Sequence, residues 1–164
     1  MIASYELFGF MPSEMANDII EWAYENEKPL YRALLKAVAD IKRVRPVYLE
    51  RQPRSQRHQL VLATLMRPAL ELTAANLLRT WLLKKHTPML AQFLESLGIE
   101  HKDGIVDDLP PSVEDEKLKK AIDELLAKYP RELVTVYLNA FNSMNDPQWK
   151  LLEEMLKTDP RLQL

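Results

Sequence analysis

Cysteine is absent from this sequence of 164 residues, and glycine occurs only three times, at Gly9, Gly98 and Gly104. The absence of cysteine excludes a disulfide framework and a thiol nucleophile, and it suits a reducing compartment such as the cytoplasm. Three isolated glycines exclude the phosphate-binding loops of nucleotide-binding proteins, because those loops need glycine for the backbone to close on a phosphate. Strands joined by tight hairpins also depend on glycine, so the scarcity of glycine disfavours a β-sheet protein.

Neither a secretory signal nor a membrane span is expected. Residues 1–8 contain no basic segment of the kind that opens a signal peptide. The most apolar stretch, residues 60–83, contains Arg67, Glu71 and Arg79. Each charge near the centre of a span costs about 2.5 to 3.5 kcal/mol, more than the leucines and valines of this stretch return. We therefore expect a cytoplasmic protein in which this stretch is a buried helix.

The three histidines carry no recognisable metal-binding or catalytic motif. None of His58, His86 and His101 follows a glutamate at the spacing of a di-iron site, and no His-Glu-x-x-His occurs. Ser55 and His58 lie three residues apart, but a nucleophilic pair also needs an orienting group and an oxyanion site. Ser55 is more simply a helix N-cap. We expect no metal, no cofactor and no catalytic residue.

The sequence is instead rich in leucine, alanine, glutamate, lysine and methionine, which are strong helix formers. Proline occurs eleven times, and seven prolines stand where an apolar helical pattern begins. Proline suits the first turn of a helix because the amide hydrogen that it lacks would have no partner there. These seven prolines are Pro12, Pro29, Pro46, Pro68, Pro88, Pro130 and Pro147.

This pattern predicts an all-α protein, an irregular multi-helix bundle or short helical array of about seven or eight helices that begin at prolines. Ser112 with Asp115 is expected to form a capping box, and Thr87 and Asp146 are expected to be N-caps. A break is expected at Pro68. The expected helices cover residues 12–26, 29–44, 55–86, 88–97, 112–129, 130–142 and 147–157, with a short turn at 46–50 and a basic linker at 51–58.

Residues 1–164 are expected to form one domain, in keeping with their number. The loop 98–112 is the candidate boundary between an N-terminal helical part and a C-terminal three-helix part. Leu72, Ala75 and Leu78 are predicted to lie in the core, because their segment is apolar on most faces. The proline spacing is compatible with paired-helix repeats, but the side chains between the prolines do not repeat, which favours a non-repeating fold.

Charge is distributed unevenly along the chain, although the net charge is only −2. Basic residues outnumber acidic ones in residues 42–86, whereas both flanking segments are acidic. Three explanations fit the basic segment 42–58, which contains Tyr48. It binds an acidic protein or a second copy of the chain, it binds nucleic acid, or it neutralises acidic helices of the same molecule. The candidate binding residues are Arg45, Arg51, Arg54, Arg57 and His58.

An acidic stripe on the helix 12–26, formed by Glu14, Asp18, Glu21 and Glu25, is the other candidate site. Carboxylates one turn apart can share a cation or act as acid and base, but a solvated helix face is the simpler interpretation. A sequence pI of about 6.0 disfavours nucleic acid as a partner. The sequence therefore favours a non-enzymatic interaction domain that binds a protein partner or itself as a homodimer. Nucleic-acid or anion binding through 42–58 is the alternative, and an enzyme of unknown type is third.

Overall fold

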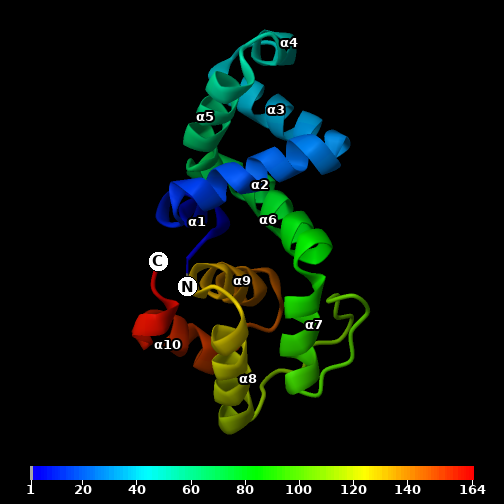
Figure 1. Cartoon of the computed structure of the whole chain (residues 1–164), viewed down its shortest axis with the longest axis vertical. Helices are drawn as coiled ribbons and strands as arrows, with labels where there is room; N and C mark the ends of the chain where they lie inside the picture. Colours follow the sequence, from blue (N-terminus) through cyan, green and yellow to red (C-terminus); the bar gives the residue numbers. More distant parts are fainter. Residues whose placement is uncertain (1) are drawn as a thin grey trace. The chain divides into compact units, whose positions relative to one another are not determined.

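The computed structural model describes residues 2–164 and is all-helical over that range, with 74% of the residues in helices and no strands (Figure 1). The predicted fold class is confirmed. The predicted number of helices is too low, since ten α-helices and two short 3-10 helices are present among the described residues. One added helix precedes Pro12, and the stretch 55–86 divides into two separate α-helices.

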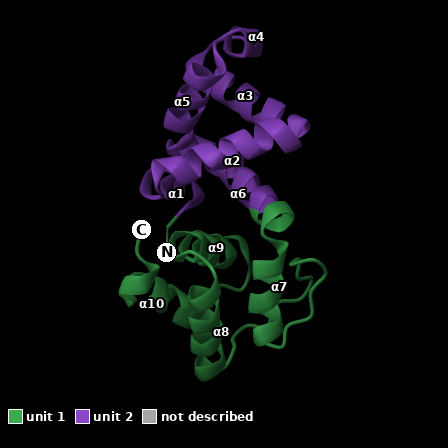
Figure 2. Ribbon diagram, in the orientation of Figure 1, with its two compact units in different colours: residues 1–2, 82–164 green, residues 3–81 purple. Residues whose placement is uncertain are grey.

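The chain divides into two compact units (Figure 2). The N-terminal unit comprises residues 3–81, and the C-terminal unit comprises residues 82–164 together with residue 2. The division falls inside one helix, α6, whereas the loop 98–112 lies within the C-terminal unit.

The N-terminal unit is built around three mutually packed helices. Its elements are α1 (Ser4–Phe10), α2 (Ser13–Asn26), α3 (Lys28–Lys42), α4 (Pro46–Glu50), α5 (Arg54–Leu65), η1 (Pro68–Leu70) and the first part of α6 (Glu71–Lys85). Helices α2, α3 and α5 pack against one another. Ile19 and Ile20 of α2, Val38 of α3, and Val61 and Leu65 of α5 are fully buried. Helix α4 lies at the end of the unit where α3 and α5 come together (Figure 1).

The predicted break at Pro68 separates α5 from α6. The two helices are bent by 100° across it. Proline ends a helical hydrogen-bond ladder because it has no amide hydrogen and its ring clashes with the preceding turn. Within residues 2–164 no single helix is long and apolar enough to cross a membrane, and only this bent pair passes that test together, on length and composition.

The C-terminal unit contains the end of α6, α7 (Thr87–Ser96), α8 (Asp115–Lys128), α9 (Arg131–Met144), α10 (Lys150–Thr158) and η2 (Pro160–Leu162). An aromatic cluster forms part of its core. The rings of Tyr137 and Phe141 lie 5.5 and 5.4 Å from that of Phe93 in edge-to-face arrangements, and Trp149 packs on Phe141 at 5.2 Å. Such offset aromatic pairs bury large apolar areas.

All four predicted N-caps are wrong. Ser55 lies inside α5, whose N-cap is Pro53. Helix α8 begins at Asp115 with Glu114 as its N-cap, so Ser112 forms no capping box. Thr87 lies inside α7, after the N-cap residue His86. Helix α10 begins at Lys150 rather than at Pro147, so Asp146 is no N-cap. The cause at α10 is the Asn142 side chain, which bonds both backbone polar groups of Trp149, at 2.9 and 3.3 Å, and holds the preceding residues outside the helix.

The predicted core positions on α6 are partly wrong. Leu78 is fully buried, as predicted, but Leu72 is 81% exposed and Ala75 is only partly buried. The buried face of α6 runs through Ala74, Leu77 and Trp81, which follow the spacing of one helical stripe. Leu72 does not belong to this stripe and projects into solvent.

Candidate functional site

The structure divides the five predicted binding residues between a buried network and an exposed turn. Arg57 and His58 are only 8% and 4% exposed, and they lie in a polar network between α2, α3 and α5. Arg54 is exposed but ion-paired. Arg45 and Arg51 lie on the surface at the two ends of α4. The predicted site is therefore not one continuous patch.

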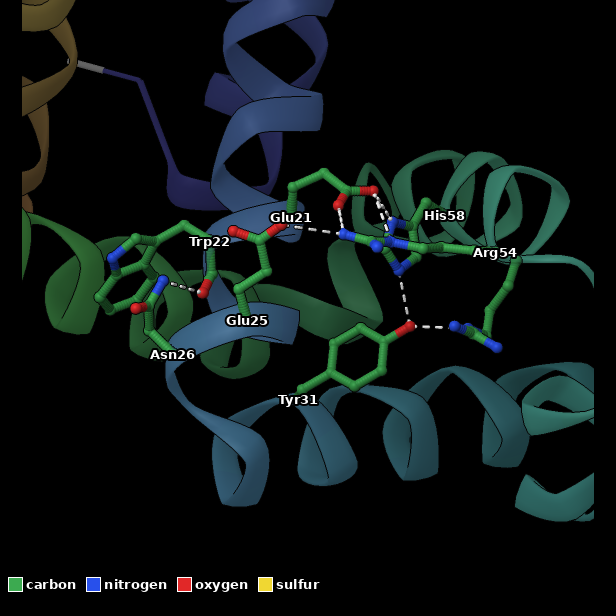
Figure 3. A network of polar contacts seen from close by, with 8 residues as sticks. Glu21, Trp22, Glu25, Asn26, Tyr31, Arg54 and His58 are labelled. Carbon is green, nitrogen blue, oxygen red and sulfur yellow. Dashed lines mark hydrogen bonds and ion pairs between the residues drawn. The ribbon is translucent and has the colours of Figure 1, made fainter.

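The network is a chain of short hydrogen bonds that joins three helices (Figure 3). His58 Nδ1 lies 2.7 Å from Glu21 Oε1 of α2, and His58 Nε2 lies 2.7 Å from the Tyr31 hydroxyl of α3. Arg57 Nε donates to the same hydroxyl at 2.7 Å. We call Glu21, Tyr31, Arg57 and His58 the polar network.

One direction of donation satisfies every member of the polar network. The Glu21 carboxylate can only accept, so His58 Nδ1 carries the proton and Nε2 accepts from the Tyr31 hydroxyl. The Tyr31 oxygen in turn accepts from Arg57 Nε–H. A protonated His58 would donate from both nitrogens and leave the Tyr31 hydroxyl hydrogen without this acceptor. The network therefore needs a neutral His58.

The pKa shifts agree with this assignment. Burial lowers the pKa of His58, and the charges of Arg57 and Arg54 add to this effect, which the Glu21 carboxylate only partly opposes. Burial also raises the pKa of Tyr31. Burial by itself would raise the pKa of Glu21, but hydrogen bonds from Arg54 and His58 and their charges leave it lowered. At neutral pH, Glu21 is ionised, Tyr31 protonated and His58 neutral.

Arg57 ties the polar network to the turn that follows α4. Its Nη1 donates to the carbonyl oxygens of Glu50 at 3.1 Å and Gln52 at 3.3 Å. These carbonyls lie at the C-terminal end of α4, where the helix itself supplies no partners. A cation at this end of a helix is also favoured by the helix dipole. Arg57 thus fixes the α4–α5 turn to the unit's core.

Arg54 covers the outer side of the network. Its guanidinium is ion-paired with Glu21 and, at 3.2 Å, with Glu25, and it stacks 4.1 Å from the centre of the Tyr24 ring. Two members of the predicted acidic stripe are therefore partnered by a basic residue of the same unit. For Arg54, neutralisation within one molecule is the observed arrangement.

The polar network is suited to holding helices together rather than to transferring protons. A catalytic tyrosine or histidine must reach a substrate. Tyr31 and His58 are buried, and both sides of the Tyr31 oxygen are occupied by Arg57 and His58. Buried polar groups that are fully hydrogen-bonded specify how helices align.

The exposed turn around α4 has a different character. Arg43, Arg45 and Arg51 are exposed, and within residues 2–164 none of them forms an ion pair. Between them lie two apolar side chains in contact with solvent, Val47 at 44% and Tyr48 at 56% exposure. We call these five residues the basic tip. The turn is anchored by the fully buried Leu49.

Arg43 has a backbone conformation that normally favours glycine. It ends α3 with φ 56° and ψ 42°, in the left-handed region. This is the position at which glycine most often terminates a helix, and another residue there costs about 1 kcal/mol or more. Arg43 thus occupies a site where glycine would be more stable.

Other features of the described chain suggest no ligand site. No group of three metal-binding side chains lies close together in residues 2–164. A hollow of about 210 Å³ in the C-terminal unit lies beside the starts of α8 and α10, and its charged lining residues Asp115 and Lys150 are both exposed. Nothing in its lining selects a ligand.

Sequence reasoning did not connect Tyr31 with the basic segment and did not predict the burial of Arg57 and His58, although a signal for the burial of His58 was present. His58, Val61 and Leu65 share one helical stripe of α5, and this stripe is the buried one. Extending the apolar period back to His58 would have predicted its burial. No family model matches the chain, and no curated protein or solved structure is significantly similar to it.

Proposed function

We propose that this chain is a non-enzymatic interaction domain whose basic tip docks on an acidic protein surface. The observation that carries the proposal is the combination of three arginines without ion-pair partners and two exposed apolar side chains on one anchored turn. Arginine binds carboxylates in a planar, two-pronged geometry. Tyrosine and arginine are also the residues that most often dominate the binding energy of protein interfaces.

The conformation of Arg43 supports this proposal. A strained backbone persists where the surrounding structure enforces it, and such strain is concentrated at functional sites. Here an arginine stands where glycine would relieve the strain. Its guanidinium is available for a partner, because its side chain has none within the described chain.

The polar network supports the proposal by holding the tip in place. Arg57 bonds the two carbonyl oxygens at the end of α4, and the same side chain is fixed by Tyr31 and, through it, His58. A binding surface that is ordered before it meets its partner loses less conformational entropy on binding. The buried residues Arg57 and His58 thus help to fix the turn that carries the exposed Arg45 and Arg51.

An acidic protein suits the tip better than nucleic acid does. Affinity for nucleic acid grows with the number of phosphates neutralised, and the tip offers three arginines opposed by the exposed Glu50. A short acidic surface with an apolar centre matches both the charge and the exposed Val47 and Tyr48.

The test is fluorescence anisotropy with a labelled peptide that has two leucines at its centre and a run of glutamates on either side. We expect binding that weakens as salt is added. Reversing two charges, Arg45→Glu with Arg51→Glu, should reduce affinity about tenfold or more, since each exposed charge contact contributes roughly 0.2 to 1 kcal/mol and reversal replaces attraction by repulsion. The matched control is Arg67→Glu with Arg79→Glu, two exposed arginines outside the tip.

Arg43→Gly separates a binding role from a structural one. Glycine relieves the left-handed strain, so the free energy of unfolding should stay unchanged or rise by about 1 kcal/mol, while affinity for the peptide falls. Equal affinity of the wild type and the tip variants, or no binding by the wild type, would overturn the proposal. Tighter binding of a thymidine oligonucleotide than of the peptide would replace it with the nucleic-acid alternative.

A further inference from the structure

The C-terminal unit carries an exposed acidic segment in the loop between α7 and α8. Within residues 100–108, four carboxylates are exposed and none makes a hydrogen bond or ion pair with the described chain. The four residues are Glu100, Asp103, Asp107 and Asp108. Lys102 is the one opposing lysine or arginine in this stretch. We call residues 100–108 the acidic loop.

A tight turn fixes residues 102–105 of the acidic loop. Lys102 and Ile105 exchange backbone hydrogen bonds of 2.9 and 3.0 Å, with Asp103 and Gly104 between them at φ 52° and 85°. The His101 ring accepts the Gly104 amide hydrogen at 3.1 Å. At the base of this turn Ile105 is 47% exposed. The loop therefore presents an apolar side chain among unpaired carboxylates.

We infer that the acidic loop of a second copy of this chain occupies the basic tip, so that two copies form a reciprocal dimer. The inference rests on the proposed function, because it names the acidic surface on which the tip docks. The tip offers three unpaired guanidinium groups around Val47 and Tyr48, and the loop offers four unpaired carboxylates around Ile105. The two surfaces carry opposite charges, and each has exposed apolar side chains that can pack on those of the other.

Each copy carries one tip and one loop, so the smallest closed assembly that satisfies both is a two-fold dimer. In such a dimer the contact between tip and loop forms twice by symmetry, so no third surface of the chain is needed. The contact is small and charged, which is typical of a weak, reversible interface. Its affinity should depend strongly on salt, because exposed ion pairs are screened over about 10 Å at 0.1 M.

A charge-swap experiment on the full chain tests the dimer. The tip-reversed variant carries Arg43→Glu, Arg45→Glu and Arg51→Glu, and the loop-reversed variant carries Glu100→Arg, Asp107→Arg and Asp108→Arg. Asp103 is left unchanged, because aspartate adopts its positive φ more readily than arginine would, whereas at Arg43 neither arginine nor glutamate has that preference. Mass is measured by light scattering after size exclusion at ~10 mM salt, where the Debye length is about 30 Å.

We expect the wild type to show the mass of two chains at concentrations of hundreds of micromolar and to dissociate in high salt. Each reversed variant alone should have the mass of one chain, since like charges then face each other. An equimolar mixture of the two variants should restore the dimer, because the reversed tip then meets the reversed loop. Arg32→Glu with Arg67→Glu and Arg79→Glu is the matched control and should leave the wild-type dimer intact.

The outcomes separate this inference from the proposed function. A wild type with the mass of one chain at low salt, or a mixture of folded variants that stays monomeric, overturns the dimer. If the glutamate–leucine peptide still binds the tip in that case, the proposed function stands with another protein as partner. If neither the peptide nor a second copy binds, both fail. Circular dichroism of each variant verifies that the reversals leave the helices folded.

Discussion

Tyr31 is the residue through which α3 joins the polar network. Its hydroxyl donates to His58 and accepts from Arg57, and all three side chains are buried. Tyr31→Phe removes both bonds and leaves His58 Nε2 and Arg57 Nε without this partner. A buried polar group left unsatisfied costs about 1 to 3 kcal/mol. We expect Tyr31→Phe to lower the free energy of unfolding in urea by roughly that amount.

Tyr24→Phe is the matched control for this measurement. Tyr24 packs edge-to-face on Tyr31 at 5.2 Å, but its hydroxyl makes no hydrogen bond within the described residues. Removing the Tyr24 hydroxyl should change the free energy of unfolding by less than about 0.5 kcal/mol. Equal effects of the two substitutions would show that the hydroxyl of Tyr31 contributes nothing beyond its ring.

Gly104 and Gly98 provide a second comparison at the scale of single residues. Both have positive φ, 85° and 69°, where alanine is strained by about 1 to 2 kcal/mol. A β-carbon at Gly104 would also lie 2.9 Å from Leu90 Cβ, whereas one at Gly98 would meet no atom within 4 Å. We expect Gly104→Ala to lower the melting temperature more than Gly98→Ala. A larger effect at Gly98 would contradict this account of the acidic loop.

At the residue scale, the sequence predicted the charges of the site but not their surroundings. The prediction groups Arg57 and His58 with Arg45, Arg51 and Arg54, because all five are basic and close in sequence. They differ in burial because Arg57 and His58 lie on the stripe of α5 that packs into the core, whereas Arg54 is the exposed first residue of that helix and Arg51 precedes it. The partner Glu21 is 37 residues from His58. No local pattern identifies a pairing at that separation.

At the scale of helices, two leucines of α6 test which face of that helix is buried. Leu78→Ala removes a fully buried side chain and should lower the free energy of unfolding by about 2 to 5 kcal/mol. Leu72→Ala, in the same helix, removes an exposed side chain and should change it by less than about 0.5 kcal/mol. Urea denaturation of the two variants measures the difference. Similar losses would contradict the buried face assigned to α6.

Helix boundaries could be predicted where a proline or a glycine marks the start or the end of the helix. Proline lies at or next to the start of α2, α3, α4, η1, α7 and α9, and Gly98 follows the end of α7 with positive φ. Helix α1 was missed because its stabilisation is partly non-local. Glu71 of α6 accepts the amide hydrogens of Ser4 at 3.1 Å and Tyr5 at 2.8 Å, satisfying donors that every helix start leaves open. A seven-residue helix held in this way has little periodicity of its own.

At the scale of the whole molecule, charge follows the two units. The basic tip belongs to the N-terminal unit and the acidic loop to the C-terminal unit. The sequence predicted a basic segment at 42–86 between two acidic flanks, but not this division, because the acidic N-terminal flank belongs to the same unit as the basic tip. It left three explanations open for the basic segment 42–58. Arg54 is neutralised internally, whereas Arg43, Arg45 and Arg51 are exposed and form no ion pair within residues 2–164.

Acid sensitivity is a property of both units, since each contains a histidine with a lowered pKa, buried at His58 and partly buried at His86. Burial, with the charge of neighbouring Lys85, lowers the pKa of His86 to about 4. His58 is shifted in the same direction, chiefly by burial. In the unfolded chain both histidines titrate near 6.5. Between these values the unfolded state binds more protons than the folded state, so acidification favours unfolding.

We therefore expect the free energy of unfolding to be constant above about pH 7 and to fall as the pH drops from about 6.5 toward 4, by no more than about 3 kcal/mol for His86. Glu21 and Asp159 act in a lower range, because their pKa values are lowered from already acidic ones. Urea denaturation at several pH values measures the slope, and nuclear magnetic resonance of the imidazole protons assigns it. His86→Gln should flatten the slope, since glutamine does not titrate. A stability that rises between pH 7 and 5 would contradict neutral histidines at these two positions, and with them the direction of hydrogen bonding from Arg57 through Tyr31 and His58 to Glu21.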